Sequence, residues 1–299
     1  MSEIAAEQFV EVAPGVRLHY ASCGDPSRPL MLMLHGFPEF WGAWREIMPA
    51  FCGSFHVVAP DLRGYNLSDK PREVRDYRPS VLVADVVGLV QALGHTRCVL
   101  VAHDWGGAIA WAVAIAHPEL VMRLVILNAP HPVPFARDLS GDPAQQKASA
   151  YMNWLRRPGS EALLAENDFA RLDGFFLKPG GRSWFDAATR AAYHAAWGQP
   201  GALTGAVNWY RASPLYPPGD EDPGAGKLHL DPSVFVVRAP TLVIWGERDP
   251  ALLPGLLEGL DAVVPGLRIV RIAEATHWLV HEQPQRVIEE IRSFVAHGD

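Results

Sequence analysis

Cysteine is scarce in this chain, with three residues among 299, Cys23, Cys52 and Cys98. They are widely separated and odd in number, and their spacing indicates neither a metal site nor a disulfide framework. The pattern favours small, reduced side chains in a cytoplasmic protein. We therefore expect an apolar core to hold the fold, since a chain of this length can build one without disulfides or structural metals.

Long apolar runs and basic clusters are also missing. The longest apolar runs have the length of strands, far short of a membrane span, and residues 1–10 lack the basic and apolar regions of a secretory signal. The formal net charge of −7 has the wrong sign for a nucleic-acid-binding surface. The sequence thus predicts a cytoplasmic protein that binds neither membranes nor nucleic acids. It leaves open whether the protein is a monomer or a homodimer.

Short apolar runs recur along the chain and alternate with helical patterns. Two runs, at 9–12 and 17–21, flank a Pro-Gly turn and predict an opening hairpin. Near-continuous apolar runs predict strands buried on both faces at 30–34, 56–59, 98–102, 124–127, 241–245 and 268–272. Helical patterns lie between many of these runs, at 80–93, 106–116 and 284–296. The alternation predicts an α/β protein with a mostly parallel eight-stranded sheet flanked by helices.

The alternation stops between residues 131 and 235, where aromatic residues and short helical patterns replace it. A structureless connection of this length is implausible in a compact domain. We therefore predict that residues 131–235 form an inserted helical lid, or cap, and that residues 1–130 and 236–299 form the core. A Pro/Gly-rich stretch at 213–226 is predicted to be the return loop of the lid.

The most informative segment, His103-Asp104-Trp105-Gly106-Gly107, lies between an apolar run and a helical pattern. It matches the form of a nucleophile elbow, a tight strand-to-helix turn that needs small neighbours and exposes its central side chain. The central residue is Asp104 instead of serine. A carboxylate is ionised at neutral pH and can displace a leaving group from a saturated carbon, which forms an ester. Taken alone, the segment leaves a simple helix N-cap as the alternative.

Two further signals fit an enzyme with this nucleophile. The turn at Phe37 follows a buried strand, and its backbone N–H can form an oxyanion hole with the N–H of Trp105. Asp249 and His277 each follow one of the last two apolar runs. The chain order of nucleophile, acid and histidine is that of α/β hydrolases. We therefore predict that His277 activates water and that Asp249 orients the histidine ring.

These residues resemble the α/β-hydrolase-fold epoxide hydrolases, and the resemblance covers nearly the whole chain. The turn His35-Gly36-Phe37-Pro38-Glu39 looks like the oxyanion loop of that family, and the loop Asp61-Leu62-Arg63-Gly64-Tyr65 looks like its next loop. Asp249 and His277 fall where the acid and base of the family fall. One departure is Asn66, which stands where glycine is common.

The same resemblance implies two lid tyrosines that donate hydrogen bonds to the epoxide oxygen. Tyr210, in Asn208-Trp209-Tyr210-Arg211, closely matches one of them, and Tyr151 is the best match for the other. Tyr193 and Tyr216 are weaker candidates. A tyrosine stays protonated at neutral pH and can act as a donor. The alternative interpretation is aromatic packing within the lid.

The resemblance implies hydrolysis of an epoxide to a vicinal diol through an alkyl-enzyme ester, without a metal or an organic cofactor. Haloalkane and haloacetate dehalogenases share the same triad plan and are the nearest alternative. A non-catalytic ligand-binding protein on the same fold is a further one. Aromatic residues of the lid suggest a small apolar or aryl substrate, in contact with Phe37, Trp105, Trp154 and Trp209. The same aromatic residues could instead form the core of the lid.

Overall fold

The computed structural model describes residues 4–177 and 183–296. Residues 1–3 of the N-terminal segment and residues 178–182 of the predicted lid lie outside the described residues. The strands are β1 Ala5–Ala13, β2 Val16–Cys23, β3 Leu30–Leu34, β4 His56–Pro60, β5 Cys98–His103, β6 Val121–Leu127, β7 Thr241–Gly246 and β8 Leu267–Ile272.

The helices fall into two groups along the chain. The core helices are α1 Pro79–Ala92, α2 Asp104–Ala116, α9 Leu279–Glu282 and α10 Pro284–Ala296. Between β6 and β7 lie α3 Pro132–Gly141, α4 Pro143–Ala148, α5 Ala150–Arg156, α6 Ser160–Leu177, α7 Ala187–Trp197 and α8 Ala202–Ala212. These helices all fall within residues 131–235. Within the described part of the chain, no helix combines the length and the apolar character needed to cross a membrane.

The sheet has the topology that the sequence predicts. The described strands form one sheet in the order β1-β2-β4-β3-β5-β6-β7-β8. β2 pairs antiparallel with β1 and with β4, and the other neighbouring pairs are parallel. The carboxyl ends of β3, β5, β6, β7 and β8 therefore share one edge of the sheet, which is where open α/β sheets bind their ligands.

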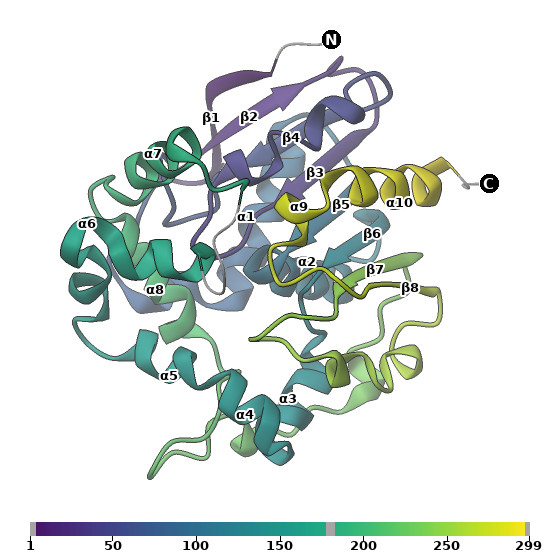
Figure 1. Ribbon diagram of the computed structural model, residues 1–299. Coiled ribbons are helices and arrows are strands. Elements are labelled where there is room, and N and C mark those ends of the chain that lie inside the picture. Colours follow the sequence, from purple (N-terminus) through teal and green to yellow (C-terminus); the bar gives the residue numbers. More distant parts are fainter. Residues whose placement is uncertain (1–3, 178–182, 297–299) are drawn as a thin grey trace.

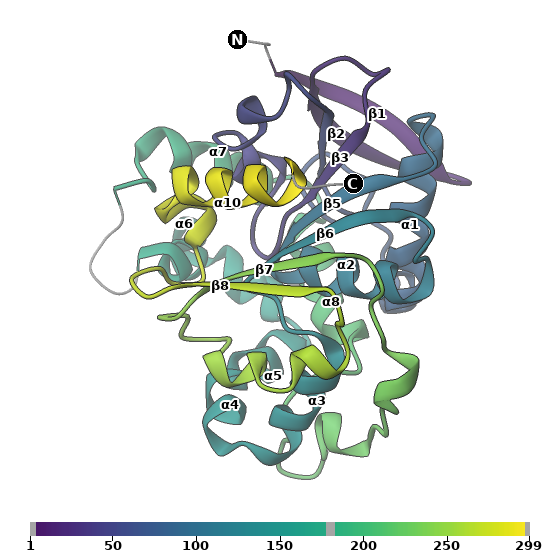
Figure 2. The ribbon, with the colours of Figure 1, turned by 90° about the vertical axis from the view of Figure 1, so that its right-hand side faces the viewer.

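Helices cover both faces of the sheet, with α1 and α10 on opposite sides (Figures 1 and 2). Successive side chains of a strand point to opposite faces. On β3, Leu32 and Leu34 therefore join the core that includes residues of α1 and α2, while Met31 and Met33 join the core that includes residues of α10. Burial on both faces explains why the strands could be predicted from near-continuous apolar runs.

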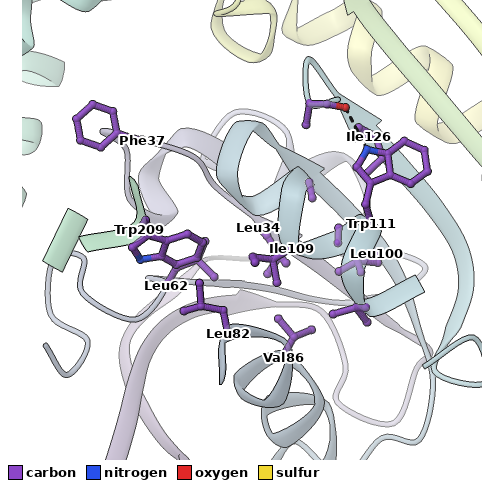
Figure 3. Packing of buried hydrophobic residues seen from close by; sticks show 14 of the residues in the cluster. Leu34, Phe37, Leu62, Leu82, Val86, Leu100, Ile109, Trp111, Ile126 and Trp209 are labelled. Atoms are coloured by element: carbon purple, nitrogen blue, oxygen red, sulfur yellow. Dashed lines mark hydrogen bonds between the residues drawn. The ribbon is translucent and has the colours of Figure 1, made fainter. Parts of the chain in front are cut away.

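Two buried tryptophans connect helices to the core of the molecule (Figure 3). Trp111 of α2 donates its indole N–H to the carbonyl oxygen of Ala129 at 3.1 Å. Trp209 of α8 lies beside Leu62 and donates its indole N–H to the carbonyl oxygen of Arg63 at 2.9 Å. Helix α8 is thus fixed to the sheet core by a side chain that is 1% exposed.

The cysteines correct the sequence-based prediction. Cys23, at the end of β2, forms a disulfide with Cys52, and their Cα atoms are 5.4 Å apart. Cys98 is free and buried. The prediction of reduced cysteines is therefore wrong for Cys23 and Cys52. Pairing of β2 with β4 brings the end of β2 close to the segment before β4, and this proximity leaves no signal in cysteine spacing. Because disulfides are uncommon in the cytosol, the cysteines no longer support a cytoplasmic location.

Reduction of the Cys23–Cys52 disulfide is expected to lower the free energy of unfolding by about 3–4 kcal/mol, because the bond restricts the unfolded chain over a separation of 29 residues. Denaturant unfolding with and without dithiothreitol measures the effect. The double variant Cys23→Ser/Cys52→Ser should be indifferent to the reductant. Equal stability of the oxidised and reduced natural chain would contradict the prediction.

Candidate active site

Asp104 stands at the junction of β5 and α2, where the backbone turns sharply. Its φ is +48°, in the left-handed region that is strained for residues other than glycine. Two glycines make room for the turn. A Cβ on Gly106 would lie 2.5 Å from the carbonyl oxygens of Leu34 and His35, and a Cβ on Gly36 would lie 2.3 Å from the Cβ of Asp104. Steric contact thus accounts for the small residues around the predicted elbow.

The carboxylate of Asp104 is held from two sides. The backbone N–H of Phe37 donates to Oδ1 at 2.7 Å, and Nε2 of His277 lies 3.5 Å from Oδ2. Burial raises the pKa of Asp104, but the hydrogen bond and charge of His277 outweigh it and hold the pKa below its ordinary value. The carboxylate is therefore ionised at neutral pH, with one oxygen bound by the Phe37 N–H.

His277 lies between two carboxylates. Its Nδ1 is 2.7 Å from Oδ2 of Asp249, and the ring is buried. Burial lowers the pKa of His277, but the charge of Asp249 and the hydrogen bonds to both carboxylates outweigh it, so the pKa stands well above its ordinary value. The protonated form of His277 is thus stabilised for as long as Asp104 carries its charge.

Asp249 is fixed by partners that the sequence analysis did not single out. Asn128 donates from Nδ2 to Oδ2 of Asp249 at 2.6 Å. The backbone N–H groups of Ala251 and Leu252 donate to Oδ1 at 2.8 and 2.9 Å. Asn128 directly follows β6, at the same sheet edge as the other site residues. Asn128 could have been predicted as a site residue because it is a polar residue directly after a buried strand.

Glu39 is a buried acid that joins several elements of the site. Its Oε2 lies 3.1 Å from Nδ1 of His103. Its Oε1 lies 2.6 Å from Nε2 of His281 and accepts from the Tyr193 hydroxyl at 2.9 Å. Burial raises the pKa of Glu39, but the two histidines outweigh it and hold the pKa well below its ordinary value. Because Nε2 of His103 lies 2.8 Å from the carbonyl oxygen of His277, the network links the turn at Phe37, the end of β5 and the loop that carries His277.

Tyr151 of α5 and Tyr210 of α8 line the same pocket as Asp104. Their ring centroids are 6.1 Å apart. The Tyr210 ring is also in edge contact with Phe37, at 5.1 Å, and with Trp105, at 5.0 Å. Burial raises the pKa of both tyrosines, and the negative charge of Asp104 raises it further. Both hydroxyls are therefore protonated at neutral pH and able to donate.

The pocket extends from Asp104 in two directions. One arm has about 520 Å³ of empty space, part of it open to solvent, with apolar lining from Pro130, Pro132, Phe135, Met152, Leu215 and Leu252. The other arm has about 680 Å³, also partly open, with lining from Ala148, Phe175, Pro250, Ala251 and Trp278. Asp104, Tyr151 and Tyr210 line both arms, while Ser213 adds a polar side chain to the first arm and His277 adds one to the second. Such a site suits an apolar ligand with one polar centre.

Two tryptophans predicted to contact substrate lie elsewhere. Trp209 is buried against the core, and Trp154 lies beside Arg171, with 5.9 Å between its ring and the guanidinium carbon. Neither lines the pocket around Asp104. This geometry corrects the prediction for both residues, because the Trp209 ring is bound to Arg63 of the core and the Trp154 ring packs beside Arg171. Tyr216, a weaker candidate from the sequence, donates its hydroxyl to Asp222 at 2.9 Å.

Known proteins are similar to this chain in both sequence and fold. Residues 29–284 match the family described as the alpha/beta hydrolase fold. Epoxide hydrolase 4 of Homo sapiens is 37% identical, over 94% of this chain and 76% of its own. The AB hydrolase superfamily protein YfhM of Bacillus subtilis is 37% identical, over 96% and 97%. The crystal structure of Bacillus megaterium epoxide hydrolase with an inhibitor has a TM-score of 0.88 at 36% identity, over 97% of this chain and 100% of that one. The chain therefore belongs to the epoxide hydrolases of the α/β-hydrolase fold.

Proposed function

We propose that this protein converts an epoxide and water to a vicinal diol through an ester on Asp104. The observation that carries the proposal is one apolar pocket in which an ionised carboxylate lies with two protonated tyrosine hydroxyls. Halide is a stable anion and leaves without a proton. An epoxide oxygen leaves as an alkoxide, which requires a donor. The tyrosine pair therefore favours epoxide opening over dehalogenation.

In the first step, Oδ2 of Asp104 attacks an epoxide carbon, since Oδ1 is engaged by the Phe37 N–H. The ring C–O bond breaks, and its electron pair goes to the epoxide oxygen. Tyr151 and Tyr210 hold that oxygen by hydrogen bonds and supply its proton. The product is an alkyl ester whose carbonyl oxygen, Oδ1, already lies beside the oxyanion donor of Phe37. The Trp105 N–H is proposed as the second donor.

Formation of the ester prepares the second step. Loss of the charge on Asp104 removes one of the two carboxylates that stabilise protonated His277, so the pKa of His277 falls. The proton that His277 gives up restores the tyrosine hydroxyl that protonated the epoxide oxygen. Neutral His277, oriented by Asp249, then takes a proton from water. The hydroxide attacks the ester carbonyl carbon. The tetrahedral intermediate collapses by breaking the bond from that carbon to the alkyl oxygen. This oxygen takes the proton of the new carboxyl group, so the diol leaves and Asp104 is again a carboxylate. The proton lost by His277 balances the proton gained by the alkoxide.

We further propose that residues 131–235 act as the cap of this catalytic core, because Tyr151 and Tyr210 reach the pocket from that segment. The apolar lining of both arms supports a small apolar or aryl epoxide as substrate. The cytoplasmic location and the oligomeric state, monomer or homodimer, stay predictions.

Substitution of either lid tyrosine by phenylalanine is expected to lower kcat/KM for an aryl epoxide by about 100-fold, since one donor to the leaving oxygen is lost. The double variant Tyr151→Phe/Tyr210→Phe should lose more activity than either single variant. Diol formation measures the effect. Tyr20→Phe, in strand β2 and outside the pocket, is the matched control and should keep full activity.

The same preparations should be offered a haloalkane and fluoroacetate, with halide release as the measurement. Diol formation that depends on Tyr210 supports the proposal. Halide release without diol, at a rate indifferent to Tyr210→Phe, would contradict it. That result would assign the protein to dehalogenation and reduce the tyrosines to packing residues.

A further inference from the structure

The two helices that carry the lid tyrosines are joined by arginines at their carboxyl ends. α5 carries Tyr151 and ends at Arg156, while α8 carries Tyr210 followed by Arg211. The two helices pack against each other. The last carbonyl groups of a helix have no partner within it and carry partial negative charge, so a cation from another helix can bind them.

Arg156 binds the carboxyl end of α8. Its Nη1 donates to the carbonyl oxygen of Tyr210, to that of Arg211 at 3.3 Å and to that of Ser213 at 3.0 Å. The guanidinium also lies over the Tyr216 ring, 3.7 Å from its centroid. One of the three carbonyls thus belongs to the tyrosine itself, so Arg156 restrains the backbone from which the Tyr210 hydroxyl projects.

Arg211 makes the reverse connection from α8 to the end of α5. Its Nη2 donates to the carbonyl oxygen of Arg157 at 2.9 Å and to Oγ of Ser160 at 3.3 Å. It also forms an ion pair with Glu161 at the start of α6. The Arg211 side chain is 15% exposed and the Glu161 side chain 27% exposed, so the pair is only partly screened by solvent. Each tyrosine helix is therefore held at its carboxyl end by an arginine from the other.

We propose that Arg156 and Arg211 are positioning residues that fix the two tyrosine hydroxyls relative to each other and to Asp104. The inference rests on the proposed function, because it assigns these arginines to the epoxide-opening step. Neither arginine lines the pocket, and both act through the helices that carry Tyr151 and Tyr210. A displacement of about 1 Å in a catalytic group can cost about 100-fold in rate, so a small rotation of α8 suffices to slow the reaction.

The proposal separates the two chemical steps. Ring opening uses the tyrosines, whereas hydrolysis of the ester uses His277, Asp249 and the Phe37 N–H. Arg156→Gln is therefore expected to slow ester formation at least about 10-fold and to change ester hydrolysis less than about 2-fold. Rapid-quench single turnovers with styrene oxide measure both rates, through protein-bound adduct and released diol.

A double-mutant cycle distinguishes positioning from general destabilisation. In a Tyr210→Phe background, Arg156→Gln should slow ester formation less than about 2-fold further, because the hydroxyl that it positions is already absent. Arg157→Gln is the matched control. It removes a neighbouring exposed charge and keeps the backbone carbonyl that Arg211 binds, so both rates should stay unchanged.

Equal slowing of both steps by Arg156→Gln, or undiminished slowing in the Tyr210→Phe background, would overturn the proposal. If Arg156→Gln does not fold, Arg156→Lys serves in the same cycle. It keeps the charge but loses the planar guanidinium that lies over the Tyr216 ring, so ester formation alone should again be slowed. If Tyr210→Phe itself leaves ester formation unchanged, the proposed role of the tyrosines in ring opening is wrong. That outcome differs from one in which only the positioning role of Arg156 and Arg211 is wrong.

Discussion

Asp104→Ala is expected to abolish diol formation, with kcat reduced by about 10⁴-fold or more. The variant removes the only atom proposed to bond to the epoxide carbon. It also removes the acceptor of the Phe37 N–H and one of the two carboxylates that bind His277. Diol release from an aryl epoxide at saturating concentration measures the loss.

Asp261→Ala is the matched control for this variant, because Asp261 is an exposed aspartate outside the pocket. It should retain full activity. Circular dichroism of both variants establishes that the fold is kept. Asp104→Ala that retained more than about one hundredth of the activity would show that water attacks the epoxide directly, and the proposed ester would be wrong.

His277→Gln is expected to stop the reaction at the ester. Without a base, hydrolysis should fall by about 10⁴-fold, and protein-bound adduct should accumulate to nearly one per chain. Loss of His277 also removes the main influence that lowers the pKa of Asp104. That pKa should therefore rise, and ester formation should weaken as pH falls. Intact-protein mass spectrometry at pH 8, where Asp104 stays ionised, measures the adduct.

The matched control is His229→Gln, which changes an exposed histidine of the loop after α8 and should show normal turnover without adduct. A His277→Gln enzyme that neither forms diol nor binds substrate covalently would contradict the proposal that His277 acts only in ester hydrolysis. In that case His277 would be needed for ring opening as well as for ester hydrolysis.

The residues at the sheet edge could be predicted because each follows a strand that is readable as an apolar run. Asp104, Asp249 and His277 come after β5, β7 and β8, and parallel strands bring these ends together. Asn66 departs from the glycine common in the family, yet it adopts a φ of +39°, which asparagine tolerates well. The departure therefore leaves the loop intact.

Partners that depend on tertiary packing could not be predicted. The Cys23–Cys52 disulfide arises from strand pairing, and cysteine spacing carries no trace of it. Trp209 lies beside Tyr210 in sequence but points to the core, because adjacent residues of a helix face different directions. The main partners of Arg156 are backbone carbonyls, which are the same for any sequence. Only the packing of α5 against α8 brings them within its reach.

The most direct test of the central claim is a single turnover of the natural enzyme in excess over an aryl epoxide, in water enriched in ¹⁸O. In the proposed route, water attacks the ester carbonyl, so the diol leaves with an oxygen from Asp104. The account predicts unlabelled diol and one ¹⁸O in the peptide that contains Asp104. Label in the diol of this first turnover, with none in Asp104, would mean that water opens the epoxide directly and would contradict the account.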